Sequence, residues 1–222
     1  MDKITRRDFV KAAAVGAVTA AGSGALACIT PVGVAGVKLP LSEGYLVVDR
    51  KKCCGCDSCM LACSLVHEGG TNLSLSRIQI VQNSFGRFPD DIELSICRQC
   101  VNPLCVQSCP TGACHVDTAN GNVRLIDASK CDGCGLCIQA CPFMPHRTVM
   151  DPKKKKAIKC DLCTAAPFWN QKGGVNGKQA CVEVCPMKAI KLVKEVPNQE
   201  GTAGYDVNLR NQRWGWLGLP TV

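Results

Sequence analysis

Apolar and polar residues alternate over short stretches in the second half of the chain, a pattern that predicts short β-strands. Two of these stretches run in parallel, CPTGACHV at 109–116 and CPMKAIKL at 185–192. In both, Cys-Pro is followed by two residues, an alanine and then alternating apolar and polar positions. Each segment is therefore expected to leave its Cys-Pro pair as a short strand.

Turn residues join these strands into hairpins. Asn120–Gly121 separates the first strand from NVRLI at 122–126, and Asp151–Pro152 separates RTVM at 147–150 from AIK at 157–159. Both dipeptides are typical of turns. We expect one hairpin at each place, each leading into a group of cysteines.

The longest uncharged stretch lies near the N-terminus, from Ala12 to Val37, and is rich in alanine and glycine. It follows TRRDFVK at 5–11, in which the pair Arg6–Arg7 comes before a polar residue, a phenylalanine and a lysine. This arrangement resembles a twin-arginine export signal, which is an address and not a part of the fold.

We interpret residues 1–35 as this signal and expect a periplasmic protein. Cleavage near Ala35 is the expected fate of the segment. Two alternatives leave the protein associated with a membrane. One is an uncleaved anchor, because the stretch is long enough to span a bilayer, and the other is lipid attachment at Cys28.

Composition indicates that apolar packing alone does not stabilise this protein. Aromatic residues make up only 5% of the 222 residues, whereas cysteine occurs 19 times. A chain of this kind depends on disulfides or on metal for cohesion. Sixteen of the cysteines fall into four groups. The groups are Cys53, Cys56, Cys59 and Cys63; Cys97, Cys100, Cys105 and Cys109; Cys131, Cys134, Cys137 and Cys141; and Cys160, Cys163, Cys181 and Cys185.

The spacing within these groups points to iron–sulfur clusters. The first and third groups read C-x2-C-x2-C-x3-C, and the last three groups end in Cys-Pro. This run is the known ligand pattern of bacterial ferredoxins, in which three thiolates hold one 4Fe–4S cluster and the fourth binds a second cluster. We expect the proline to end the short helix that carries the fourth cysteine.

Structural zinc and a disulfide framework are the alternatives. Zinc needs two C-x2-C pairs, which leaves the third cysteine of a group without a use. Disulfides suit an exported protein, but cysteines three positions apart in one turn are poorly placed to pair with each other. The repeated spacing favours clusters over both.

The four groups, their order and the segment KCDLC…ACVEVCP resemble the four-cluster ferredoxin-type electron-transfer (β) subunits of molybdenum and tungsten oxidoreductases. CSLVHEG at 63–69 and SRI at 76–78 resemble in particular the exported iron–sulfur proteins that accompany tungsten aldehyde oxidoreductase homologues. The resemblance covers residues 45–195. Two departures are Ser64, where the family has a proline, and a long insertion at 164–180.

This resemblance implies an α+β fold of two tandem bacterial-ferredoxin-like modules with short hairpins and short helices. The first and fourth cysteine groups (53–63 and 160–185) share one module, and the second and third groups (97–109 and 131–141) share the other. The implied ligands are Cys53, Cys56, Cys59 and Cys185 for cluster one; Cys63, Cys160, Cys163 and Cys181 for cluster two; Cys97, Cys100, Cys105 and Cys141 for cluster three; and Cys109, Cys131, Cys134 and Cys137 for cluster four.

The resemblance also implies a function. The chain would relay single electrons through four 4Fe–4S clusters, between a molybdenum/tungsten pterin oxidoreductase catalytic subunit and a membrane quinone-linked subunit or cytochrome. A free periplasmic polyferredoxin and an enzyme whose clusters serve a substrate directly are the alternatives. All cluster ligands are cysteines, and neither a nucleotide-binding loop nor a Ser–His–Asp set stands out. We therefore expect no catalytic residues and no cofactor beyond the clusters.

The charged residues and histidines do not alter the prediction of an electron-transfer protein. The formal charge of +8 is offset by the negative charge of thiolate-bound clusters, so we expect no nucleic-acid partner. Lys153–Lys156 either dock an acidic surface or form a solvated hairpin tip. His67, His115 and His146 are expected in surface or packing roles, with His67 alternatively close to cluster two or to a partner.

The cluster assignment gives no role to three further features. Cys54 and Cys114 are not needed as ligands, and Cys114 is expected to be a small buried hydrophobe. The tail at 196–222 contains Trp214 and Trp216, and it either docks a partner or packs back onto the protein.

Overall fold

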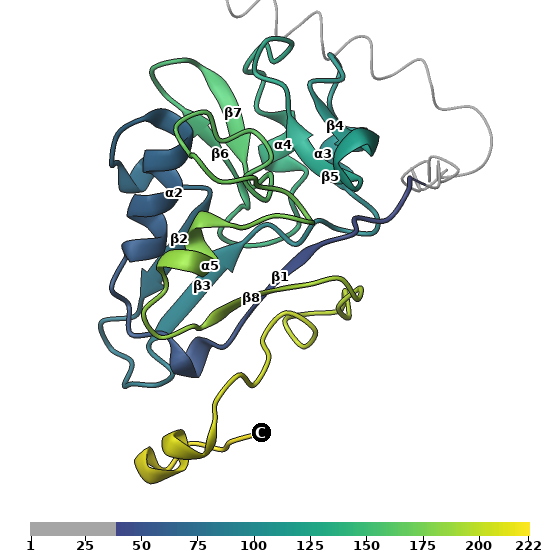
Figure 1. The fold of residues 1–222 in the computed structure, drawn as a ribbon. Coiled ribbons are helices and arrows are strands. Elements are labelled where there is room, and N and C mark those ends of the chain that lie inside the picture. Colours follow the sequence, from purple (N-terminus) through teal and green to yellow (C-terminus); the bar gives the residue numbers. More distant parts are fainter. Residues whose placement is uncertain (1–38) are drawn as a thin grey trace, which may run out of the picture. The chain divides into compact units, whose positions relative to one another are not determined.

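The structure is a computed structural model that describes residues 39–222. The predicted export signal at 1–35, with Arg6–Arg7 and Cys28, lies outside these residues. The part described has short strands and few helices, as expected for an α+β ferredoxin-like protein (Figure 1).

Eight short strands pair into four antiparallel two-stranded sheets. None of the strands is longer than five residues. The pairs are β1 (Tyr45–Val48) with β8 (Ile190–Val193), β2 (Ile78–Gln82) with β3 (Ile92–Ile96), β4 (Cys114–Asp117) with β5 (Val123–Ile126), and β6 (Thr148–Asp151) with β7 (Lys156–Lys159).

The helices are short apart from one. They are α2 (Ser58–Glu68), α3 (Leu104–Gln107), α4 (Leu136–Gln139) and α5 (Ala180–Val184), with 3₁₀ turns η1 (Arg50–Lys52), η2 (Leu73–Leu75), η3 (Thr118–Asn120) and η4 (Gln212–Leu217). Within residues 39–222, no helix is long and apolar enough to cross a membrane.

Both predicted hairpins are confirmed, as β4–β5 and β6–β7. The turn of the first includes Gly121, whose φ of +71° is in the left-handed region that glycine enters without strain. The strand predicted in CPMKAIKL is confirmed as β8. Its partner β1 comes from the opposite end of the described chain, a pairing that the local pattern did not predict.

The prediction that the proline ends a short helix carrying the fourth cysteine is wrong. Helices α3, α4 and α5 carry the third cysteine of their groups and end before the fourth. Cys185, for example, caps α5 with an extended backbone (φ −65°, ψ 111°). A residue before proline is disfavoured in the helical region, so the proline forces the fourth cysteine itself out of the helix.

The first group shows what happens without the proline. Ser64 follows Cys63, and α2 continues through both residues to Glu68, ending at Gly69 with a left-handed φ of +73°. The Ser64 hydroxyl donates to the carbonyl of Leu61 (3.0 Å) and accepts from the backbone N–H of Asn72 (2.9 Å). A serine is therefore tolerated inside the helix and also fixes the chain that returns from it.

The apolar core is small and contains thiols. Its largest cluster combines aliphatic side chains of β1, β2, β3 and β8, such as Leu46, Ile78 and Ile96, with buried cysteines of the first and fourth groups. A second cluster packs Ala113 and Ala157 around cysteines of the third group. None of the cysteines in the described part of the chain forms a disulfide.

The C-terminal tail divides into two parts. Its first part packs on the body, because the backbone N–H of Val48 donates to the carbonyl of Tyr205 and the N–H of Val207 donates to the carbonyl of Val48 (2.8 Å each). Its second part, η4, exposes Trp216 and Leu217. In Figure 1 this turn lies at the yellow end of the tail.

Candidate iron–sulfur cluster sites

The structure brings the first and fourth cysteine groups together in two cavities. We name the set implied for cluster one site 1, and the set implied for cluster two site 2. All four thiols of site 1 line one cavity, and all four thiols of site 2 line another. Helix α2 connects the two sites, since it carries Cys59 of site 1 and Cys63 of site 2.

The second and third groups come together in the same way. The four thiols of the set implied for cluster four, named site 4, line one cavity between β4, α4 and β7. The set implied for cluster three is named site 3. Its cysteines come from neighbouring elements, because α3, which carries Cys105, packs against α4, which ends two residues before Cys141. Burial and the charges on Cys97, Cys105 and Cys141 raise the pKa of the Cys100 thiol to about 12.

The donor sets fit iron–sulfur clusters. Each site offers four thiol sulfurs and, at sites 1, 2 and 4, a cavity that they border. Within residues 39–222, no three His, Cys, Asp or Glu side chains converge to hold a single metal ion. Four thiolates around a shared space are the ligands of a 4Fe–4S cluster, which supplies reversible uptake of one electron when it is bound.

One backbone feature recurs in all four cysteine loops. The residue before the second cysteine has a left-handed φ in every group: Gly55 (+67°), Gln99 (+47°), Gly133 (+79°) and Leu162 (+54°). Only glycine adopts this conformation without cost. Its presence at Gln99 and Leu162 indicates that the turn, which aims two thiols at one site, is imposed by the surrounding structure.

The fourth cysteine of each group accepts a backbone hydrogen bond from a downstream residue. The donors are Arg77 N–H to Cys63 Sγ (3.4 Å), Cys114 N–H to Cys109 Sγ (3.2 Å), Arg147 N–H to Cys141 Sγ (3.4 Å) and Ala189 N–H to Cys185 Sγ (3.3 Å). Such bonds stabilise the thiolate form that binds metal. The cysteine spacing carries no signal of them.

His67 lies in a buried network beside site 2. Its Nε2 is 3.0 Å from Asp161 Oδ1 and its Nδ1 is 2.7 Å from the carbonyl oxygen of Cys63, so both ring nitrogens face acceptors. Burial disfavours the charged ring, but the hydrogen bonds to Asp161 and Cys63 together outweigh it and raise the pKa of His67 to about 9. Arg77 Nη1 donates to the other oxygen of Asp161 at 2.8 Å.

This placement decides between the two roles expected for His67. The ring is 5% exposed and lines the cavity of site 2, so the surface role is excluded. The sequence analysis did not identify Asp161 or Arg77 as part of this site. Asp161 follows Cys160 directly, but nothing in the cysteine spacing indicates that it pairs with His67.

The other cysteines and histidines that the sequence analysis discussed lie in varied environments. Cys114 is buried, as expected, and lines the cavity of site 4, while Cys54 is exposed beside site 1. His115 and His146 are half-buried and each approaches a nearby backbone carbonyl oxygen.

Lys153–Lys155 lie in the turn between β6 and β7, and Lys156 is the first residue of β7. Lys154 pairs with Glu68 and Lys156 donates to the carbonyl of Cys131. The first three lysines of the run are exposed.

Exposure differs among the four sites. Site 1 has one exposed cysteine, Cys56, and site 4 has one, Cys134. Every cysteine of sites 2 and 3 is buried or half-buried.

The geometry defines a ferredoxin-type protein that carries 4Fe–4S clusters. Residues 91–195 match the 4Fe–4S dicluster domain family. The chain is 34% identical over 158 residues to the thiosulfate reductase electron transfer subunit PhsB of Salmonella typhi, covering 68% of this chain and 77% of that protein. It is 35% identical over 172 residues to an iron–sulfur protein of Rhodospirillum rubrum, covering 69% and 84%.

A third relative matches over more of the chain. Protein NrfC of Escherichia coli (strain K12) is 33% identical over 201 residues, covering 88% of this chain and 83% of that protein. The chain belongs to this family of 4Fe–4S electron-transfer proteins. The prediction of an electron-transfer subunit of oxidoreductase complexes, and not of a catalytic chain, is thereby confirmed.

Proposed function

We propose that this protein is an exported electron-transfer subunit that holds four 4Fe–4S clusters in sites 1 to 4. The observation that carries the proposal is the meeting of four distant cysteine groups in four tetrads, each with the composition that one cluster needs. Within residues 39–222 no three ligand side chains are placed to hold a single metal ion such as zinc, and no cysteine forms a disulfide.

A shared helix and the effect of charges in one tetrad on thiols of the next support a linear order of the four sites. Sites 1 and 2 share α2. Burial and the charge on Cys97 of site 3 raise the pKa of Cys160 of site 2. Burial and the charge on Cys105 of site 3 likewise raise the pKa of Cys137 of site 4 to about 11. The order is therefore 1–2–3–4, with the exposed Cys56 and Cys134 at opposite ends.

Helix contacts support the two-module arrangement. Helix α2 packs against α5, which belongs to the fourth cysteine group, and α3 packs against α4, which belongs to the third. Strand β8 packs against α5 of the first helix pair, and β1 pairs with β8. Each proposed module thus contains two helices and two sites.

The partners that we propose are a molybdenum or tungsten pterin oxidoreductase catalytic subunit at one end and a membrane quinone-linked subunit or cytochrome at the other. One relative is named as an electron transfer subunit of thiosulfate reductase, which supports a partner of the oxidoreductase class. The exposed Trp216 and Leu217 of η4 supply an apolar surface for docking. Residues 1–35 direct export by the twin-arginine pathway.

Iron and acid-labile sulfide analysis of anaerobically prepared holoprotein tests the cluster count. We expect about sixteen irons per chain, and zinc in their place contradicts the proposal.

Cys134→Ala removes one exposed ligand and should convert one cluster into a 3Fe form with its own electron paramagnetic resonance signal. Cys54→Ala, the matched control, removes an exposed cysteine outside the tetrads and should leave iron content unchanged.

A further inference from the structure

Two cationic side chains lie buried next to site 3 without a carboxylate partner. Arg124 in β5 is fully buried, and Lys159 at the end of β7 is 3% exposed. Among residues 39–222, no Asp or Glu oxygen is within ion-pair distance of either. A buried charge is strongly destabilising unless an opposite charge compensates it.

Backbone carbonyls fix both groups in place but do not neutralise them. The Arg124 guanidinium donates to the carbonyls of Cys100 (3.1 Å), Asn122 (2.6 Å) and Pro40 (2.8 Å). The Lys159 ammonium donates to the carbonyl of Arg124 at 2.8 Å. The two cations are thus tied to each other and to the loop that carries the second cysteine group.

The anions that surround these cations are cysteine thiolates. Burial lowers the pKa of Lys159, but the charges on four thiols, led by Cys97 and Cys105 of site 3 and followed by Cys114 and Cys160, together outweigh it and raise the pKa. The charge on Cys100 likewise opposes the effect of burial on the pKa of Arg124.

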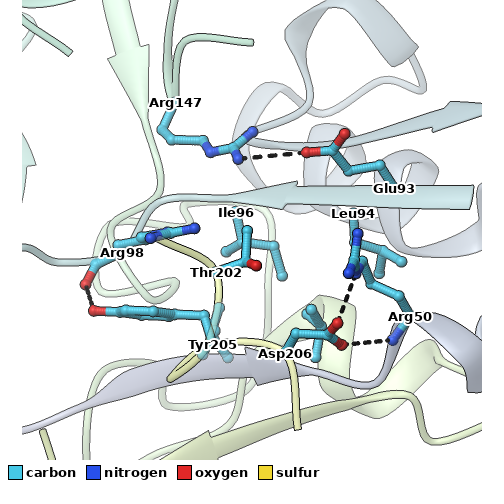
Figure 2. Close-up of a pocket in the computed structure, with 11 residues that line it drawn as sticks. Arg50, Glu93, Leu94, Ile96, Arg98, Arg147, Thr202, Tyr205 and Asp206 are labelled. Atoms are coloured by element: carbon cyan, nitrogen blue, oxygen red, sulfur yellow. Dashed lines mark hydrogen bonds and ion pairs between the residues drawn. The ribbon is translucent and has the colours of Figure 1, made fainter. Parts of the chain in front are cut away.

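Two more arginines approach the same site. Arg98 lies over the ring of Phe143, 4.1 Å from its centroid, and is adjacent to Cys97 in the chain. The Nε and Nη1 atoms of Arg147 are buried and have no hydrogen-bond partner, and its Nη2 is 3.9 Å from Glu93. Figure 2 shows both arginines at the rim of a pocket that the tail residue Tyr205 helps to close.

The other sites lack this surplus of fully buried positive charge. Lys156, which donates to the carbonyl of Cys131 at site 4, is only half-buried. Site 2 contains Arg77, but Asp161 pairs with it directly. Lys51 and Lys52, in the turn before site 1, and Lys153–Lys155, in the β6–β7 turn beside site 4, are partly or fully exposed, so solvent and salt screen their charges.

We propose that Lys159 and Arg124 are the counterions of the cluster held by Cys97, Cys100, Cys105 and Cys141, and that this cluster is the most readily reduced of the four. The inference rests on the proposed function. Reduction adds one electron to the cluster and forms or breaks no bond, so it makes the site more negative by one charge. Fixed cations in a water-poor interior stabilise that added charge.

A redox titration of full-length holoprotein, followed by electron paramagnetic resonance, tests the proposal. In Lys159→Met the wave at the highest potential should move to lower potential, with the other three waves unchanged. Lys159→Arg keeps the charge and should keep the potential. Lys155→Met removes an exposed lysine of the β6–β7 turn and is the matched control, in which all four waves should stay in place.

A Cys141→Ser variant assigns the wave, because it should disturb the same signal that Lys159→Met moves. Unchanged potentials in Lys159→Met, or a shift in a signal that Cys141→Ser leaves intact, would overturn the counterion role. If Lys159→Met does not assemble, Arg98→Gln should shift the same wave in the same direction by a smaller amount, and an unmoved wave there overturns the proposal. Iron content of the unmodified protein tests the four-cluster function separately.

Discussion

At the scale of single residues, the cysteine loops depend on backbone conformation as much as on thiols. Gly133 shows this best, because it has a φ of +79° and a Cβ added to it would lie 2.2 Å from the carbonyl oxygen of Lys155. The third cysteine loop is thereby packed directly against the β6–β7 turn. Glycine satisfies two separate requirements at this position, a left-handed backbone and the absence of a side chain.

Gly133→Ala should therefore destabilise the protein by about 3 kcal/mol, from roughly 1 kcal/mol of backbone strain and a larger clash. Gly135→Ala is the matched control, since Gly135 has nearly the same φ (+77°) but open space around the added Cβ. It should cost only about 1 kcal/mol. Denaturant unfolding of the two anaerobic holoproteins measures the difference, and equal losses would show that the close approach to Lys155 is unimportant.

At the scale of elements, the length of α2 distinguishes the first cysteine loop from the others. The helix runs on past Cys63 because Ser64, and not a proline, follows the cysteine. The extra turn contains His67 and Glu68, which reach Asp161 and Lys154 respectively. One substitution relative to the family pattern thus gives this helix its contacts with the fourth cysteine group and with the β6–β7 turn.

Ser64→Pro tests whether this extension stabilises the fold. Proline inside α2 removes a helical hydrogen bond and should cost about 3 kcal/mol or more, with loss of the His67–Asp161 contact. Ser64→Ala keeps the helix and loses only the hydroxyl bonds, at about 1 kcal/mol. Thermal unfolding and circular dichroism compare the two, and a proline variant as stable as the alanine variant would mean that the extra turn contributes nothing.

At the scale of the whole molecule, the sheets and helices are too small to hold together by themselves. Each sheet has two strands, and an isolated two-stranded hairpin is at best marginally stable in water. The buried thiols lie inside the apolar clusters that join these pieces. Cohesion therefore depends on whatever the thiols bind.

Removal of iron should unfold the protein. An anaerobic holoprotein treated with a strong iron chelator is expected to lose its visible absorption and its secondary structure together, and reconstitution with iron and sulfide should restore both. The coupling follows because metal binding to thiolates contributes directly to folding free energy. A colourless protein that keeps its circular dichroism spectrum and melts cooperatively would contradict this account.

Local patterns in the sequence predicted what is local in the structure. The cysteine spacing, the turn at Asn120–Gly121 and the strand after Cys185 each depend on a few adjacent residues, so the hairpins and β8 were predictable. The β1–β8 pairing, the contact of His67 with Asp161 and the packing of Tyr205 on Val48 join residues far apart in the chain. Nothing in their immediate neighbours specifies these partners, and tertiary packing alone determines them.

Sites 1 and 2 each combine thiols from the first and the fourth groups, and this has a consequence for biosynthesis. While the ribosome is still producing the chain, sites 3 and 4 have all their ligands once Cys141 has emerged. Site 1 waits for Cys185, which emerges later. The middle of the polypeptide is therefore ready to receive its inorganic centres before the groups on either side of it are complete.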